Sequence, residues 1–363
     1  MNLWIALRHH SLARLSAVLL LIFYVTVFFA DWIAPYDPYL SEASAALLPP
    51  SQIYWRDHTT KNWLGPHVYP TEQGPLDLET GDRQMEVQWD TPVPLGFWVK
   101  GEPHHFLWWT SDRHLFGTTN TAAKFYVLGT DDQGRDQLSR LLYGGRISLS
   151  IGIVGIAISF PLGILMGGIS GYFSGFADTL IMRLVEVLMT IPSIYLLVAL
   201  AAVLPDNLGM SQRFLLIVLI TSFIRWAGLA RVIRGQVLSI KEREFVQAAR
   251  AMGGRSLYII LRHVLPQTFT YVIISATLVV PSFIEAESVL SLIGLGIQQP
   301  AASWGNMLAV STNASILILQ PWLVWPLALL IILTVLSFNL LGDGLRDVLD
   351  PRNLSPEDSG LSP

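Results

Sequence analysis

The 363-residue chain contains no cysteine, which excludes disulfide bonds, thiolate metal sites, iron–sulfur clusters and a cysteine nucleophile. Charged residues are also scarce. They make up 14% of the sequence, whereas soluble domains carry about 25%. The formal net charge of −4 is small and spread out, so it gives no indication of nucleic-acid binding. Hydrophobic residues reach 52%, a composition typical of a membrane protein.

Two motifs that power or catalyse reactions are missing as well. The sequence has no G-x-x-x-x-G-K-[ST] loop for ATP phosphates and no HExxH zinc motif. It also shows no recognisable nucleophile–base pair, so we expect neither an enzyme nor a bound cofactor. A membrane enzyme built on the tryptophan-rich segment is the first rival hypothesis. A self-sufficient secondary transporter is the second, but such proteins show inverted repeats or intramembrane ion sites, and neither is evident.

Long apolar segments are the dominant feature of the sequence. About 20 mostly apolar residues cross a bilayer as a helix, and six segments qualify: 16–34, 148–170, 179–204, 213–237, 266–295 and 321–342. The first is longer than the apolar core of a signal peptide, about 7–15 residues. Trp32 and Tyr36 at its end suit a membrane interface. We therefore expect an uncleaved first span and a helical membrane protein with six spans.

The segment between the first two spans differs from the rest. Residues 35–146 contain six of the twelve tryptophans together with many turn-forming residues. Such aromatic content favours a folded domain over a disordered loop, and the turn signals predict short strands or irregular structure. His104, His105 and His114 form the one cluster with metal-ligand chemistry, although surface histidines are the ordinary explanation.

Basic residues gather near both termini and after the fourth span. Their members are Arg8, Arg14, Arg231, Arg234, Lys241, Arg243, Arg250, Arg255, Arg262, Arg346 and Arg352. Such residues mark cytoplasmic loops, and six spans place all three regions on one side. The expected domains are therefore a tail with the first span (1–34), an extracytoplasmic insert (35–146), a five-helix core (147–345) and a cytoplasmic tail (346–363).

A charged segment lies between two of the most apolar parts of the chain. In "KEREFVQAARAMGG", Phe245, Ala248, Ala249 and Met252 fall at helical spacing and form one apolar stripe. Acidic residues favour the helix start, and Gly253 favours its stop. We expect a short helix over 242–253. It could lie on lipid, pack on its own bundle or insert into a groove of a partner.

The same segment resembles the cytoplasmic "EAA" loop of ABC importer permeases. Here the motif reads Gln247-Ala248-Ala249, then Gly253, then "HVLP", with Gln247 in place of the usual glutamate and His263 at an apolar position. Four more segments are similar to the dipeptide/oligopeptide/nickel branch (DppC/OppC type). They are "LGTDDQGRDQLSRLLYGGRISL", "GYFSGFADTLIMRLVEVLMTIPSIYL", "SLIGLGIQQPAASWGNML" and "LSFNLLGDGLRDVLDPR". The segment 35–125 is longer than usual, as in microcin-C-type peptide permeases.

This resemblance implies the type I importer permease fold in the inner (plasma) membrane, with both termini cytoplasmic. It implies peptide transport together with a second homologous permease, two ABC ATPases, an extracytoplasmic solute-binding protein and membrane lipid. The ATPase-coupling residues would be Glu244, Phe245, Gln247, Ala248, Ala249, Met252 and Gly253. Nickel or another non-peptide solute is the alternative cargo.

Charged and small residues within the spans are further candidates. Glu287 matches a family glutamate and Glu285 is an additional one; both could line the solute path or serve structure. Arg183 and Glu186 are spaced for an ion pair. Glycines at four-residue spacing from Gly163 allow close helix packing, either for simple stability or for a bundle that bends during transport.

Overall fold

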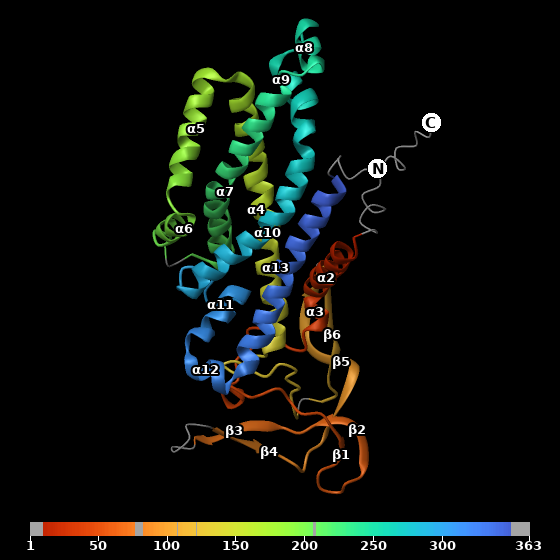
Figure 1. Cartoon of the computed structure of the whole chain (residues 1–363). Coiled ribbons are helices and arrows are strands. Elements are labelled where there is room, and N and C mark those ends of the chain that lie inside the picture. The colour runs from red at the N-terminus through yellow and green to blue at the C-terminus, as the bar shows by residue number, and fades with distance from the viewer. Residues whose placement is uncertain (1–9, 77–82, 107, 121, 206–207, 350–363) are drawn as a thin grey trace, which may run out of the picture. The chain divides into compact units, whose positions relative to one another are not determined.

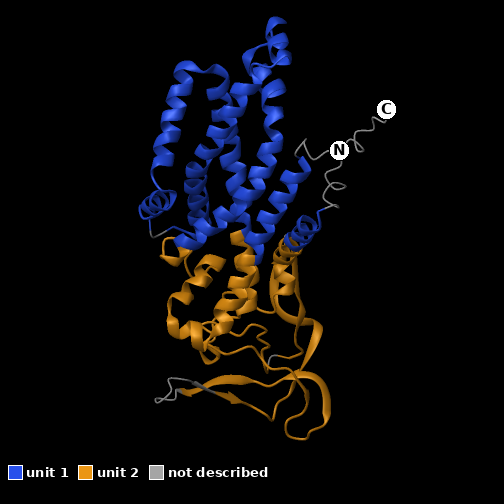
Figure 2. Ribbon diagram, viewed as in Figure 1, with its two compact units in different colours: residues 1–21, 149–290, 333–363 blue, residues 22–148, 291–332 orange. Residues whose placement is uncertain are grey.

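The computed structural model describes residues 10–76, 83–106, 108–120, 122–205 and 208–349, and most of these residues are helical (Figure 1). The chain divides into two compact units (Figure 2). Unit 1 comprises residues 1–21, 149–290 and 333–363, and unit 2 comprises residues 22–148 and 291–332. Parts of the expected tails, residues 1–9 and 350–363, lie outside the described residues.

Five described helices are long and apolar enough to cross a membrane. They are α2 (Ser11–Phe28), α4 (Gln137–Phe173), α7 (Met210–Ile240), the helical stretch that ends in α10 (Phe269–Leu292), and α13 (Pro321–Leu349). The stretch before α10 consists of α9 (Ser256–Ile259), a π-helical turn η2 (Ile260–Val264) and a 3-10 turn η3 (Leu265–Thr268). The remaining candidate is a bent pair.

The expected third span is broken in two. α5 (Gly175–Thr190) and α6 (Ser193–Ala201) meet at an angle of 87°. Pro192 lies at the break and forms the N-cap of α6. Because proline has no backbone N–H and clashes with the preceding turn, it cannot continue α5. Counted as one broken span, the pair gives six spans.

A glycine stripe on α4 brings this helix against α7 within unit 1. A Cβ atom added to Gly163 would lie 3.0 Å from the carbonyl oxygen of Trp226, and one added to Gly171 would lie 2.8 Å from that of Arg234. Gly167 approaches α7 in the same way between them. The predicted close packing is therefore confirmed. Contact positions rise together along both helices, so α4 and α7 run in the same direction, and α5 with α6 must return the chain between them.

The insert in unit 2 forms strands, so the expected all-α architecture applies to the membrane-spanning part alone. A four-stranded antiparallel sheet has the order β1 (Tyr54–Arg56), β2 (Trp63–Val68), β5 (Val93–Phe106), β6 (Trp109–Thr118). β3 (Thr71–Leu76) and β4 (Arg83–Val87) make a separate pair. Short helical pieces complete the unit: α3 (Ala30–Ile33), η1 (Ala43–Ala45), α11 (Trp304–Leu308), η4 (Ala309–Thr312) and α12 (Ala314–Leu319).

A buried ionic network joins two distant segments of unit 2. Arg135 and Arg140 both contact Asp131, at 2.7 and 3.3 Å, and both donate to the side-chain oxygen of Gln299. Asp136 precedes α4 and accepts hydrogen bonds from the backbone and hydroxyl of Ser139. Burial raises the pKa of Asp136 to about 6. The network thus joins two of the segments that carry the family resemblance.

Candidate functional sites

The charged segment forms α8 (Glu244–Ala251), a helix shorter than the expected range of 242–253. Its end is a Schellman motif, because the Gly253 N–H donates to the carbonyl of Arg250 and the Gly254 N–H donates to that of Ala249. Gly253 has φ +79°, the left-handed conformation predicted for it. The glycine pair therefore turns the chain sharply into α9.

The predicted apolar stripe of α8 is divided between two faces. Val246 is 0% exposed and Ala249 is 5% exposed, and both pack into a hydrophobic cluster with Ile240 of α7 and Ile259 of α9. Three other stripe residues face away from this cluster: Phe245, Ala248 and Met252 are exposed. The structure thus places Ala249 in internal packing. Helical spacing identified the apolar positions but could not tell the chain's own core from an outer face.

Lys241, the C-cap of α7 just before α8, and Arg250, in the last turn of α8, attach this region to the end of α4. The Lys241 ammonium donates to the carbonyl of Gly171 at 2.9 Å and to the hydroxyl of Ser174 at 2.7 Å. The Arg250 guanidinium lies 4.9 Å from the Tyr172 ring centre and donates to its hydroxyl. Cation–π contacts of this kind are attractive. These contacts join α8 and the end of α7 to the end of α4.

A second tie connects α5 to α7 close by. Asp178 accepts two hydrogen bonds from the guanidinium of Arg234, at 2.5 and 2.6 Å, and a third from Ser170. Bidentate pairs of this type hold both partners in a defined geometry. Sequence reasoning treated Arg234 as a topology signal and did not select Asp178. An acidic residue directly before the third expected span was the available signal.

Glu285 and Glu287 of α10 have different environments. Glu285 is exposed and lines a cavity of about 170 Å³ together with Arg225 of α7 and Leu197 of α6. Arg225 also donates to the carbonyl of Ser282. Glu287, in contrast, is 1% exposed and lies inside unit 1. Of the two candidate pathway residues, Glu285 is therefore the one that faces open space next to a cation.

The predicted pair of Arg183 and Glu186 on α5 is also formed. Their side chains lie 3.0 Å apart, and both are exposed. Exposed pairs of this kind stabilise a protein weakly, by about 0–1 kcal/mol. We therefore assign the pair to the surface of α5 and not to the transport path.

The three histidines of the insert do not assemble into a metal site. In the part of the chain that the structure describes, no group of three His, Asp or Glu side chains comes together. His114 has both ring nitrogens near carbonyl oxygens, those of Ala34 and Glu102, at 2.6 and 3.0 Å. His104 is buried beside it. Burial and the neighbouring His114 lower the pKa of His104.

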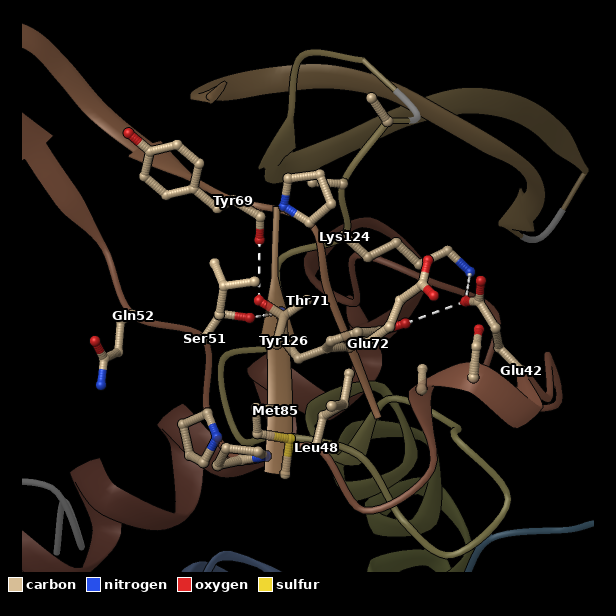
Figure 3. Close-up of a pocket in the computed structure, with 18 of the residues that line it drawn as sticks. Glu42, Leu48, Ser51, Gln52, Tyr69, Thr71, Glu72, Met85, Lys124 and Tyr126 are labelled. Carbon is tan, nitrogen blue, oxygen red and sulfur yellow. Dashed lines mark hydrogen bonds and ion pairs between the residues drawn. The ribbon is translucent and has the colours of Figure 1, made fainter. Parts of the chain in front are cut away.

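A cavity of about 480 Å³ lies within the insert between η1, β3 and the segment before α4 (Figure 3). Lys124 and Tyr126 both reach Glu42, whose Oε2 accepts from them at 2.7 and 3.3 Å. Burial and the Glu42 carboxylate raise the pKa of Tyr126, which keeps the hydroxyl a donor. The volume of the cavity suits a small molecule, and of its two lining carboxylates Glu42 is already engaged by Lys124 and Tyr126.

Family models and known proteins match large parts of this chain. A family model described as "Binding-protein-dependent transport system inner membrane component" matches residues 159–355, and "N-terminal TM domain of oligopeptide transport permease C" matches residues 2–50. The chain is 41% identical over 248 residues to the oligopeptide transport system permease protein OppC of Haemophilus influenzae, covering 68% of this chain and 77% of that protein.

Other relatives give a similar result. The dipeptide transport system permease protein DppC of Bacillus subtilis is 42% identical over 224 residues, which cover 62% of this chain and 68% of that protein. A solved structure of the MetNI methionine ABC transporter in an inward-facing conformation is 20% identical. That match covers 57% of this chain and 95% of the other, with a TM-score of 0.42.

Proposed function

We propose that this chain, which belongs to the binding-protein-dependent transport system inner membrane component family, forms half of the path of an ATP-driven peptide importer. The chain is a multi-pass membrane permease, and its family is one of transport subunits rather than enzymes. In our proposal a second homologous permease completes the path. Two ATPase subunits supply energy, and an extracytoplasmic binding protein delivers the solute.

The proposed membrane topology has six crossings with α8 on the cytoplasmic side. The parallel course of α4 and α7 supports it, because the bent pair of α5 and α6 must then count as one crossing. An even number of crossings leaves both termini on the side of α8. The insert precedes α4 and α8 follows α7, so the insert lies on the outer side. The basic residues around α8 agree with this orientation.

The observation that carries the proposal is the divided surface of α8. One face packs into the core of unit 1, and the other face carries the exposed side chains of Phe245, Ala248 and Met252. We place the ATPase contact on this exposed face, in the helix-in-groove mode. Gln247 donates to Glu242 and stays exposed at the helix start. Glu244 and Gly253 set the two ends of the helix.

Movement of α8 then reaches the spans through two sets of side-chain contacts. Lys241 and Arg250 hold it to the end of α4, and the Asp178–Arg234 pair holds α5 to α7. Closure of the ATPases on ATP would shift these ends together. Binding at one site thereby biases a two-state arrangement at another.

The relatives support a peptide cargo over nickel, since they are named as oligopeptide and dipeptide permeases. Glu285 beside Arg225 is our candidate for contact with the charged ends of a peptide. Glu287, which is buried, is assigned to the structure of α10.

Co-purification tests the proposal. Affinity-tagged chain isolated from its native membrane should bring a second permease and ATPase subunits with it. A cysteine at Phe245 should crosslink to an ATPase, and a cysteine at Ser111 should react with an impermeant label added from outside. Isolation of the chain alone, with uptake that needs no ATP, would favour a secondary transporter instead.

A further inference from the structure

The β5–β6 hairpin of unit 2 ends in an exposed aromatic tip. Phe106 pairs with Trp109 across the turn, and Trp108 lies in the turn itself. Trp108 is 83% exposed and Trp109 is 67% exposed. Each of these rings leaves a large apolar area unburied at the tip.

This tip is fixed beside the end of the first span, within the same unit (Figure 1). The ring of Phe106 lies 5.4 Å from that of Phe28, 5.6 Å from that of Phe29 and 5.0 Å from that of Trp32. Edge-to-face and stacked rings at such distances attract one another. The hairpin therefore cannot be placed far from the level at which α2 ends.

The exposed apolar face of α2 continues onto the hairpin. Ile22, Val25 and Phe28 are exposed and follow one another at helical spacing. Phe28 is the last residue of α2 and touches Phe106. A membrane span exposes such a stripe to lipid, so the hydrocarbon surface reaches the base of the tip.

Polar residues lie next to the tip on both strands of the hairpin. The His105 ring and the Thr110 hydroxyl lie 3.0 Å apart, and Lys100 pairs with Asp112 further along the hairpin. A strand rises about 3.3 Å per residue, so Arg113 lies about 13 Å beyond Trp109. The interfacial layer of a bilayer is about 5–8 Å thick on each side. The tip alone fits that layer, with the charged residues clear of it.

We propose that the β5–β6 hairpin is a membrane-interface anchor, with Trp108 and Trp109 seated among the lipid headgroups beside the end of α2. Amphipathic aromatic rings favour this level of the membrane. The hairpin then holds the insert at a fixed distance from the bilayer beside the end of α2. This inference uses the membrane location of α2 and does not depend on the transported solute or on the ATPase contact.

Spin labelling tests the anchor directly, because the chain contains no cysteine. Trp108→Cys carries a nitroxide in the assembled transporter, reconstituted in lipid nanodiscs with cysteine-free partner subunits. Asp112→Cys on β6 is the matched control. We expect the label at position 108 to be relaxed more strongly by oxygen and less strongly by an aqueous nickel chelate than the label at position 112. Equal relaxation by the chelate at both positions, or protection from both agents at position 108, would overturn the proposal. The second pattern would indicate a protein partner.

Fluorescence gives a second measurement that keeps the tip aromatic. Brominated lipids should quench the native transporter, and the double variant W108F/W109F should lose part of the quenchable signal. Trp63→Phe is the control, since Trp63 is 68% exposed but lies on β2. Equal quenching loss in the control and the double variant would contradict the anchor.

Discussion

Matched substitutions of two neighbouring alanines on α8 can distinguish the proposed docking face from the face that packs inside the protein. Ala249 is 5% exposed within the cluster that includes Ile240 and Ile259, whereas Ala248 is exposed. Overfilling a packed core costs about 1–3 kcal/mol, and an indole ring belongs at the upper end of that range. Ala249→Trp should therefore lower the thermal stability of the purified permease. Ala248→Trp adds its ring outside the core, where substitutions change stability by about 0.5 kcal/mol or less.

We expect the opposite ranking of the two variants when ATPase binding is measured: Ala248→Trp should have the larger effect. If α8 docks into a groove of the ATPase as proposed, a ring at position 248 would block that groove, and each loss of about 1.4 kcal/mol weakens binding tenfold. We expect at least a tenfold weaker association of ATPase with Ala248→Trp, measured by titrating purified ATPase onto permease in nanodiscs. Solute-stimulated ATP hydrolysis should fall with it. Our division of α8 is refuted if Ala248→Trp binds the ATPase and couples normally. It is also refuted if Ala249→Trp unfolds at the same temperature as the unmodified permease.

Three other outcomes are expected. Gly253→Val places a β-branched residue at φ +79°, at a cost of about 1–2 kcal/mol, so crosslinks from α8 to the ATPase should be lost; Gly253→Asn, which tolerates this conformation, should retain them. Glu285→Gln should raise the KM for uptake of a cationic peptide with normal assembly, while Glu287→Gln, a change at a buried position, should reduce assembled transporter; equal effects on KM would contradict this. The pKa of His104 lies below 6.5 in the folded state, so protonation favours release of the hairpin. After correction for the intrinsic exchange rate at each pH, the amide protection factors of the hairpin should fall as pH falls from about 8 to about 5 and stay constant in His104→Gln.

Local sequence signals predicted the features that depend on near neighbours. The stop at Gly253, the pairing of Arg183 with Glu186 and the glycine stripe beginning at Gly163 each follow from residues within one helix. The break of the third expected span at Pro192 needed the structure. Strands in the insert were expected from turn residues, but the 14-residue length of β5 was not.

Features that depend on distant residues were beyond the sequence. Tyr36, expected at the membrane interface, accepts a hydrogen bond from the backbone of Phe125 and packs against Tyr126. The contact between Asp178 and Arg234 joins helices that are separated by 56 positions. Periodicity specifies which residues share a face, but the identity of the surface opposite that face depends on the folded chain.

The length of α7 has a mechanical consequence. Its 31 residues contain no proline, and at 1.5 Å per residue the helix is about 46 Å long. The Asp178–Arg234 pair grips it about 9 Å from its α8 end and about 13 Å from Arg225. The glycine stripe of α4 also packs along α7 from Trp226 to Arg234, so a sideways push at α8 would tilt the two helices together. Because Arg225 lies one residue beyond this packed stretch, that tilt would change the width of the cavity beside Glu285.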